Sequence, residues 1–81
     1  MELSELRIQL DKINNDLLEL FIKRMEIAGQ VAEYKRINNM PVFDSGRERQ
    51  ILNDIAEKSG EDMRSYSTVL FSMIMELSRV Y

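Results

Sequence analysis

The sequence lacks two residue types on which many functional sites depend. None of its 81 residues is cysteine or histidine. Without cysteine there are no disulfides and no thiolate metal sites, and without histidine the commonest metal ligand and the commonest general base are missing. We therefore predict no metal site and no cofactor. A domain of this length buries only about two-thirds of its unfolded surface, and oligomerisation is the remaining way to support so small a core.

Long apolar runs are also missing. The longest contain three residues, as in 20–22 and 69–71, whereas a transmembrane helix needs about 20. Residues 1–7 contain no apolar signal-peptide core, so we expect a cytoplasmic protein. The net charge of −3 and the pI near 4.9 argue against binding to a phosphate backbone. We expect neither a membrane nor a nucleic acid as a partner.

Proline and glycine, which interrupt helices, are scarce, with one and three residues. Apolar residues recur every three or four positions and never alternate as in a strand, which predicts an all-α fold. We expect one long, one short and one medium helix at about 5–37, 45–59 and 62–81, with a loop at 38–44. The first helix must end before Pro41, because proline disfavours the helical conformation of the residue that precedes it.

Each predicted helix has an apolar face. The residues of these faces are, in the first helix, Leu6, Leu10, Ile13, Leu17, Leu20, Ile27, Val31 and Tyr34, in the second, Ile51, Leu52, Ile55 and Ala56, and in the third, Met63, Tyr66, Leu70, Met73, Leu77 and Val80. We predict Ser4 as the N-cap of the first helix and Asp44 or Ser45 as that of the second, which Gly60 ends.

The first helix is long for so small a chain. About 33 residues give a helix of about 50 Å, whereas a compact globule of this chain length is only about 30 Å across. Because the apolar face runs along nearly the whole helix, the overhang must be covered. We predict an all-helical homodimer with the long helices packed together. The alternative is a monomer whose first helix kinks near Gly29.

Charged residues interrupt the apolar faces. Arg24 and Lys35 lie eleven residues apart on one stripe of the first helix, which is about three turns. Arg47 and Glu48 project from the first turn of the second helix. Arg7 points about 100° away from Arg24 around the helix, so that in a dimer it reaches the pocket of the partner.

Taken together, these four cations exceed the nearby acids, Asp44 and Glu48, in a chain that is otherwise acidic. Such a surplus indicates an anionic ligand, most simply a dicarboxylate or a phosphate, since arginine holds a carboxylate through two parallel hydrogen bonds. The alternative is a structural ion pair between Arg24 and Glu48, with the other charged groups reaching solvent.

Three segments carry a family resemblance. They are Leu6-Arg7 followed by Ile13-x-x-x-Leu17-Leu18-x-Leu20-Phe21, then Arg24-x-x-Ile27-Ala28-x-x-Val31-x-x-x-Lys35, and then Pro41-Val42-x-Asp44-x-x-Arg47-Glu48. In these segments the chain resembles the all-helical (AroQ-class) chorismate mutases, and the resemblance extends along nearly its whole length. It implies an intertwined homodimer with two active sites that converts chorismate to prephenate in phenylalanine and tyrosine biosynthesis, without a cofactor.

The resemblance also implies roles for individual residues. Arg24 and Arg7 of the partner subunit hold a substrate carboxylate. Lys35 donates a hydrogen bond to the ether oxygen of the substrate, and Glu48 accepts one from its ring hydroxyl. Catalysis then rests on Lys35, Arg24 and Glu48.

Three further residues match positions that support substrate binding, namely Asp44, Arg47 and Ser78. For Ser78, a small residue at a helix contact is an equally good interpretation. The family places a glutamine or glutamate one turn beyond this serine, and Tyr81 comes before that position. We therefore expect residues 1–81 to be a single chorismate mutase domain with reduced activity, cut from a longer or bifunctional protein. The alternative is a third helix that is naturally short.

Other functions are compatible with parts of this pattern. An isochorismate-pyruvate lyase of the same fold shares the pocket cations. A non-catalytic dimerisation or regulatory module binds a carboxylate effector with the same residues. A plain antiparallel coiled-coil adaptor needs only the apolar seam and leaves Arg24, Lys35 and Glu48 unexplained.

Overall fold

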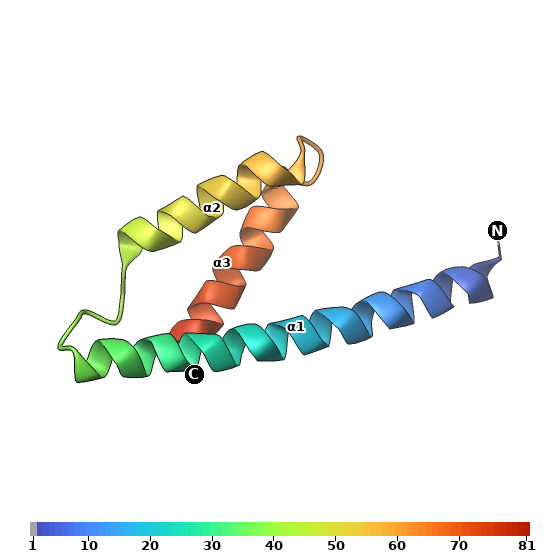
Figure 1. Cartoon of the computed structure of the whole chain (residues 1–81). Coiled ribbons are helices and arrows are strands. Elements are labelled where there is room, and N and C mark those ends of the chain that lie inside the picture. The colour runs from blue at the N-terminus through green and yellow to red at the C-terminus, as the bar shows by residue number, and fades with distance from the viewer. Residues whose placement is uncertain (1) are drawn as a thin grey trace.

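The computed structural model describes residues 2–81 as three α-helices joined by two short connections (Figure 1). The helices are α1 (Leu3–Ile37), α2 (Ser45–Ser59) and α3 (Arg64–Val80). The predicted all-α class, with one long, one short and one medium helix, is confirmed, and the helix ends agree with the expected ones to within two residues. Within the described residues, no helix combines the length and the apolarity needed to cross a membrane.

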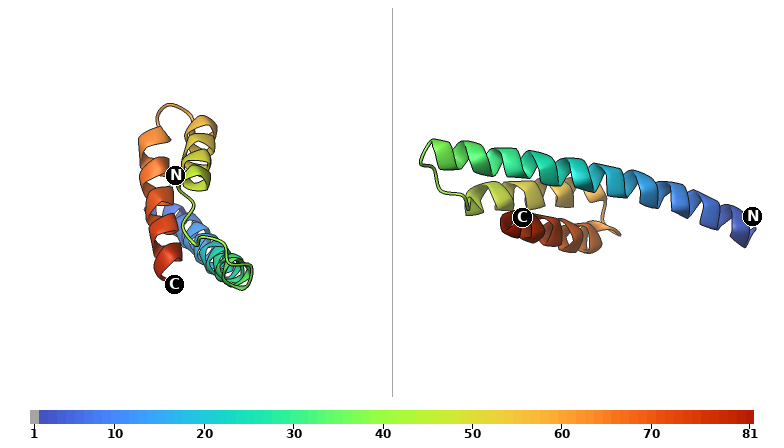
Figure 2. Two further views of the ribbon diagram at one scale, coloured as in Figure 1. Left: turned by 90° about the vertical axis from the view of Figure 1, so that its left-hand side faces the viewer. Right: turned by 90° about the horizontal axis from the view of Figure 1, so that it is seen from below.

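α2 and α3 form a hairpin, and α1 lies against one end of it (Figures 1 and 2). The C-terminal end of α3 contacts α1 around Arg24 and Gly29, and the N-terminal half of α1 projects beyond the hairpin. The molecule is therefore elongated, measuring 55 × 26 × 16 Å. Every residue from 2 to 20 is exposed, so the apolar face of this projecting half is uncovered in the single chain.

The core of the chain is small and lies between α2 and α3. Within residues 2–81, Met75 of α3 is the one buried side chain, with 5% exposure. The predicted face of α2 is confirmed, because all four of its residues are half-buried. The predicted face of α3 does not pack within the single chain, since all six of its residues are exposed. A second stripe packs inward instead, formed by Ser67, Thr68, Phe71, Ile74, Met75 and Ser78.

The helix N-termini follow the sequence only in part. The prediction that Ser4 caps α1 is wrong, because the helix already begins at Leu3, and Glu2 occupies the cap position without a side-chain hydrogen bond. Of the two predicted caps for α2, the structure uses Asp44, whose Oδ1 accepts a hydrogen bond from the backbone N–H of Arg47 at 3.0 Å. That bond satisfies one of the free amide groups in the first turn.

α1 and α2 end where the sequence predicts. α1 passes Gly29 without interruption and ends at Ile37. The backbone N–H of Met40 donates to the carbonyl of Lys35 at 2.8 Å, and Asn39 takes the left-handed conformation that this turn requires, with φ 54°. Gly60 ends α2 with φ 79°, a value that glycine adopts without steric cost. The first of these turns reverses the chain, so that the loop before α2 lies beside Lys35.

Candidate active site

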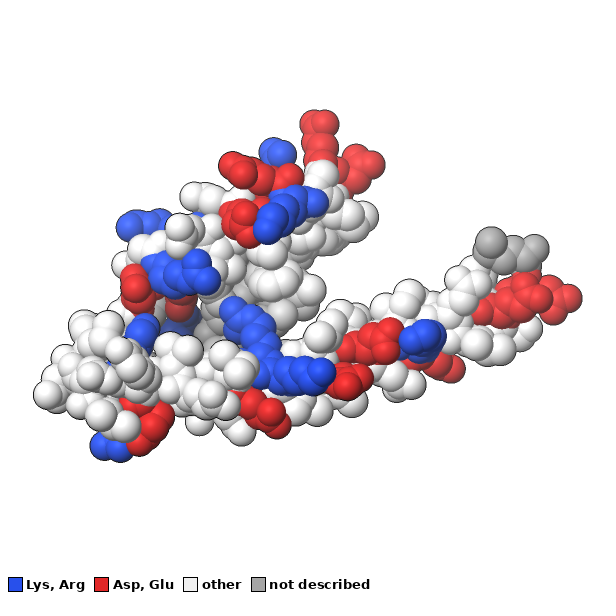
Figure 3. Space-filling view, viewed as in Figure 1, with Lys and Arg blue, Asp and Glu red and all other residues white. Residues whose placement is uncertain are grey.

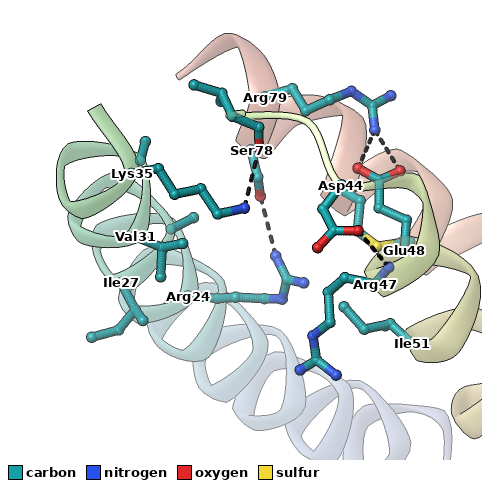
Figure 4. A pocket seen from close by; sticks show the side chains of 14 residues that line it. Arg24, Ile27, Val31, Lys35, Asp44, Arg47, Glu48, Ile51, Ser78 and Arg79 are labelled. Atoms are coloured by element: carbon teal, nitrogen blue, oxygen red, sulfur yellow. Dashed lines mark hydrogen bonds and ion pairs between the residues drawn. The ribbon is translucent and has the colours of Figure 1, made fainter. Parts of the chain in front are cut away.

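An open cavity of about 350 Å³ lies where α1, the start of α2 and the end of α3 meet (Figure 4). Its volume falls in the range of small-molecule sites, about 300–1,000 Å³. Seven of its lining residues are apolar and come from every element around it, namely Ile27, Ala28, Val31 and Ala32 of α1, Val42 of the loop, Ile51 of α2 and Met75 of α3. The remaining lining residues are polar or charged.

The charges in the cavity are unbalanced. It is lined by the cations Arg24, Lys35, Arg47 and Arg79 and by the carboxylates Asp44 and Glu48. Positive charge therefore exceeds negative charge by two, although the whole chain carries −3. Figure 3 shows cationic side chains around the hollow between α1 and the α2–α3 hairpin. A cavity with this balance favours a ligand with two negative charges.

Two predicted cations reach the cavity from α1. They lie on the same side of the helix because eleven residues correspond to about three turns, and this side faces the cavity. The Nζ of Lys35 donates to the carbonyl of Val42 at 3.3 Å, which joins α1 to the loop. The Nη1 of Arg24 donates to the hydroxyl of Ser78 at 3.1 Å. Both cations keep further N–H groups that a ligand can use, because an ammonium has three and a guanidinium five.

Ser78 is half-buried on the inner stripe of α3, one turn after Ile74. Its hydroxyl donates to the carbonyl of Ile74 at 2.8 Å and accepts the hydrogen bond from Arg24. A serine hydroxyl has one proton, so this geometry uses it within α3 and turns a lone pair toward Arg24. The direct structural effect of Ser78 is therefore to orient the Arg24 guanidinium.

The first turn of α2 supplies the other predicted residues. Asp44 caps the helix through one oxygen, and its carboxylate lies on the cavity wall. Arg47 donates from Nη1 to Oε1 of Gln50 at 2.9 Å. The alternative ion pair between Arg24 and Glu48 is absent from the structure of residues 2–81. Both carboxylate oxygens of Glu48 accept instead from Nη1 of Arg79, at 2.6 and 2.5 Å.

Arg79 is the charged lining residue that the sequence reasoning missed. It comes from the last turn of α3 and meets Glu48 across a separation of 31 residues, which no local pattern reports. A weak signal exists in the sequence, because Arg79 follows Met75 by four positions and thus continues the stripe that packs inward. That signal becomes visible only once the packed face of α3 is known.

Arg7 is the one predicted site residue that lies away from this cavity. It is exposed on the projecting half of α1 and precedes Arg24 by seventeen residues, which is about 26 Å along the helix. Six of the seven predicted residues therefore line the cavity of a single chain. Because Arg7 lies outside the cavity of its own chain, its contribution to a partner's cavity stays a prediction.

Comparison with known proteins shows to which family the chain belongs. A family profile described as "Chorismate mutase type II" matches residues 6–81. The chain belongs to the chorismate mutase type II family. The match covers α2, α3 and all but the first three residues of α1, and it includes every residue predicted for the site, Arg7 among them. No solved structure gives a significant match to the chain.

Several curated proteins are similar to this family member. The "Chorismate mutase" of Methanocaldococcus jannaschii is 37% identical over 54 residues, which are 67% of this chain and 54% of that protein. The "Bifunctional chorismate mutase/prephenate dehydratase" of Aquifex aeolicus is 35% identical over 60 residues, which are 74% of this chain and 17% of that protein. The "T-protein" of Haemophilus influenzae is 34% identical over 61 residues, 72% of this chain and 16% of that protein. The chain thus matches about half of the first relative and less than a fifth of the other two.

Proposed function

We propose that this chain rearranges chorismate to prephenate. The observation that carries the proposal is the excess of two positive charges in a cavity that is otherwise lined largely by apolar side chains, in a member of the chorismate mutase type II family. Chorismate is a dianion built on a carbon ring, so its two carboxylates match the excess charge and the carbon atoms of its ring match the apolar lining residues.

The reaction suits a site without histidine or cysteine. It is a pericyclic shift in which the ether C–O bond breaks ahead of the forming C–C bond, and it requires no nucleophile, metal or general base. The protein has to hold the flexible dianion in its reactive conformation and stabilise negative charge developing on the ether oxygen. An acceleration of about 10⁶-fold corresponds to about 8 kcal/mol from these two effects.

The proposed roles follow the charges of the cavity. Lys35 donates to the ether oxygen, and Arg24 binds a carboxylate while Ser78 holds its guanidinium. Glu48 accepts a hydrogen bond from the ring hydroxyl. Asp44 and Arg47 support the site at the start of α2. Each of these residues lines the cavity, which supports the assignment of all of them to one substrate.

We also propose that the active form is a homodimer in which α1 of each subunit covers the other. The proposal is supported by the large apolar residues that the single chain leaves exposed along α1, among them Leu10 at 56%, Leu17 at 55% and Leu20 at 62%. Packing against a second copy removes this surface from water. It also brings Arg7 of the partner subunit toward the cavity. The cytoplasmic location stays a prediction of the sequence.

Replacing Leu17 by aspartate is expected to break the dimer. Leu17 lies in the middle of the exposed seam, and the variant places one uncompensated carboxylate per subunit in the interface, which is strongly unfavourable. We expect the dissociation constant of the dimer to rise by at least about 100-fold, measured by analytical ultracentrifugation. Asp11→Asn, on the same half of α1 and outside the seam, is the control. An unchanged dissociation constant for Leu17→Asp contradicts this interface.

The proposed function is tested by following the loss of chorismate ultraviolet absorbance with the purified chain. We expect turnover to prephenate that a bicyclic dicarboxylate mimic of the transition state inhibits. Isochorismate supplied to the same sample is expected to yield no salicylate and pyruvate, which separates the mutase from a lyase of the same fold. Bound mimic without turnover indicates a binding site that lacks catalytic power. A folded dimer that does not turn over chorismate overturns the proposal, whether or not it binds the mimic.

A further inference from the structure

Arg79 forms the one ion pair between residues distant in the sequence within 2–81. The other four pairs there join residues three or four positions apart on a single helix, and each of their side chains is more than half exposed. Arg79 and Glu48 come from different helices, and their side chains are 38% and 25% exposed. Nη1 of Arg79 lies close to both carboxylate oxygens of Glu48 (Figure 4). This pair therefore forms at the cavity, where solvent competes less for its two charges.

The guanidinium of Arg79 also lies over an aromatic ring. Its Cζ is 5.1 Å from the centroid of the Phe43 ring, which belongs to the loop before α2. A planar cation at this distance is attracted to the face of the ring. Arg79 thus connects the end of α3 to the loop and to the first turn of α2, and both of its contacts define how its guanidinium is oriented.

The ion pair between Arg79 and Glu48 determines which charged groups of the cavity remain available to bind a ligand. Glu48 shares the cavity with Arg24, Lys35 and Arg47, and a mobile carboxylate there can turn to one of these cations and neutralise it. Nη1 of Arg79 instead keeps the carboxylate at the side of the cavity that α3 supplies. A carboxylate has about four acceptor sites, so Glu48 retains acceptor capacity for a hydroxyl donor while it is bound to Arg79.

We propose that Arg79 is a positioning residue that fixes the Glu48 carboxylate for the hydroxyl group of a dianionic substrate and keeps it from the cations that bind the substrate carboxylates. The inference rests on the proposed function, in which Glu48 accepts a hydrogen bond from the ring hydroxyl. It adds a residue from the end of α3 that acts through Glu48. It also predicts that recognition of the hydroxyl depends on this arginine.

The test is the Arg79→Ala variant, assayed for KM and kcat with chorismate. The hydroxyl contact exists in both the bound substrate and the transition state, so its loss acts on KM more than on kcat. We expect KM to rise by about 10- to 100-fold with kcat changed by less than about threefold. Arg79→Lys, which keeps the charge and loses the planar fork, is expected to recover part of the lost affinity. A KM within about threefold of the unmodified chain overturns the inference.

A double-mutant cycle with Glu48→Gln tests whether Arg79 acts through Glu48. If it does, Arg79→Ala changes KM by less than about threefold once Glu48→Gln is present. An undiminished effect in that background shows that Arg79 acts by another route and overturns the inference. If Arg79→Ala fails to fold by circular dichroism, Arg79→Gln takes its place, because it keeps an apolar stem and removes the charge.

Arg36→Ala is the matched control. It removes another arginine–glutamate pair, with Glu33, outside the cavity. There the hydrogen bond from Arg36 lowers the pKa of the Glu33 carboxyl below its ordinary value. We expect KM to be unchanged in this variant.

Binding of the bicyclic dicarboxylate mimic, measured by calorimetry, separates this inference from the proposed function. If the unmodified chain does not turn over chorismate, the proposed function fails. The inference then stands or falls on whether Arg79→Ala weakens binding of the mimic by about 10-fold or more.

Discussion

Replacing Lys35 by alanine is expected to abolish measurable turnover of chorismate, a loss of about 10³-fold in kcat. Lys35 is the cation assigned to the ether oxygen, where negative charge develops only as the bond breaks. A donor used in the transition state more than in the ground state acts on kcat rather than on KM. The measurement is the initial rate of chorismate loss at saturating substrate, together with circular dichroism and sedimentation to verify the fold and the dimer.

The chain offers a matched control for this variant. Lys58→Ala also removes one lysine, whose Nζ pairs with Asp54 at 3.0 Å on the exposed side of α2 with 71% of its side chain accessible. We expect its rate to equal that of the unmodified chain. Lys35→Arg keeps the positive charge but changes the position of the donors, and an intermediate rate is expected. Retained turnover in Lys35→Ala contradicts the role given to Lys35.

The parts of the fold that the sequence predicted well are those decided by local interactions. The end of α1 is such a case, because the turn at Asn39 is made of hydrogen bonds between residues at most five positions apart. Gly60 is another, since its φ of 79° is a property of one residue. Ser4 shows the limit of the same reasoning. It has the chemistry of a cap, but the helix extends two residues further toward the N-terminus, where Glu2 occupies the cap position without a side-chain bond.

The packed face of α3 was not predictable from periodicity alone. α3 has two apolar stripes, one through Leu70 and Leu77 and one through Phe71 and Met75, and both repeat every three or four residues. Helical spacing shows that each stripe lies on one face, but not which face meets α2. The structure turns Phe71 and Met75 inward and leaves the other stripe exposed. The exposed stripe is a second apolar surface available to a partner subunit.

The residues of the candidate site also fall into two groups, those that patterns within one helix predict and one that such patterns do not. Arg24 and Lys35 were found because one helix places them on one side, and Arg47 and Glu48 because both lie in the first turn of α2. Arg79 was missed because its partner lies on another helix. Contacts of this kind depend on how the helices cross, which the periodicity within each helix does not determine.

Mixing two inactive variants is expected to restore activity if the site is shared between subunits. Arg7→Ala and Arg24→Ala each remove one cation from every site, and each alone is expected to lose about 10²-fold in kcat/KM, because a carboxylate loses a charged partner. In a heterodimer of the two, one site lacks both arginines and the other has both. With random exchange, half of the dimers are mixed, and about a quarter of all sites are intact.

The recovered rate is therefore expected to approach about a quarter of that of the unmodified chain. The control is a mixture of Arg24→Ala with Lys35→Ala. Both residues line the cavity of the same chain, so every site in that heterodimer lacks one of them and no recovery is expected. Subunit exchange is verified by fluorescence transfer between labelled chains. If exchange occurs and the Arg7→Ala and Arg24→Ala mixture stays inactive, Arg7 does not complete the partner's cavity, and the single-chain excess of two positive charges has to bind the dianion alone.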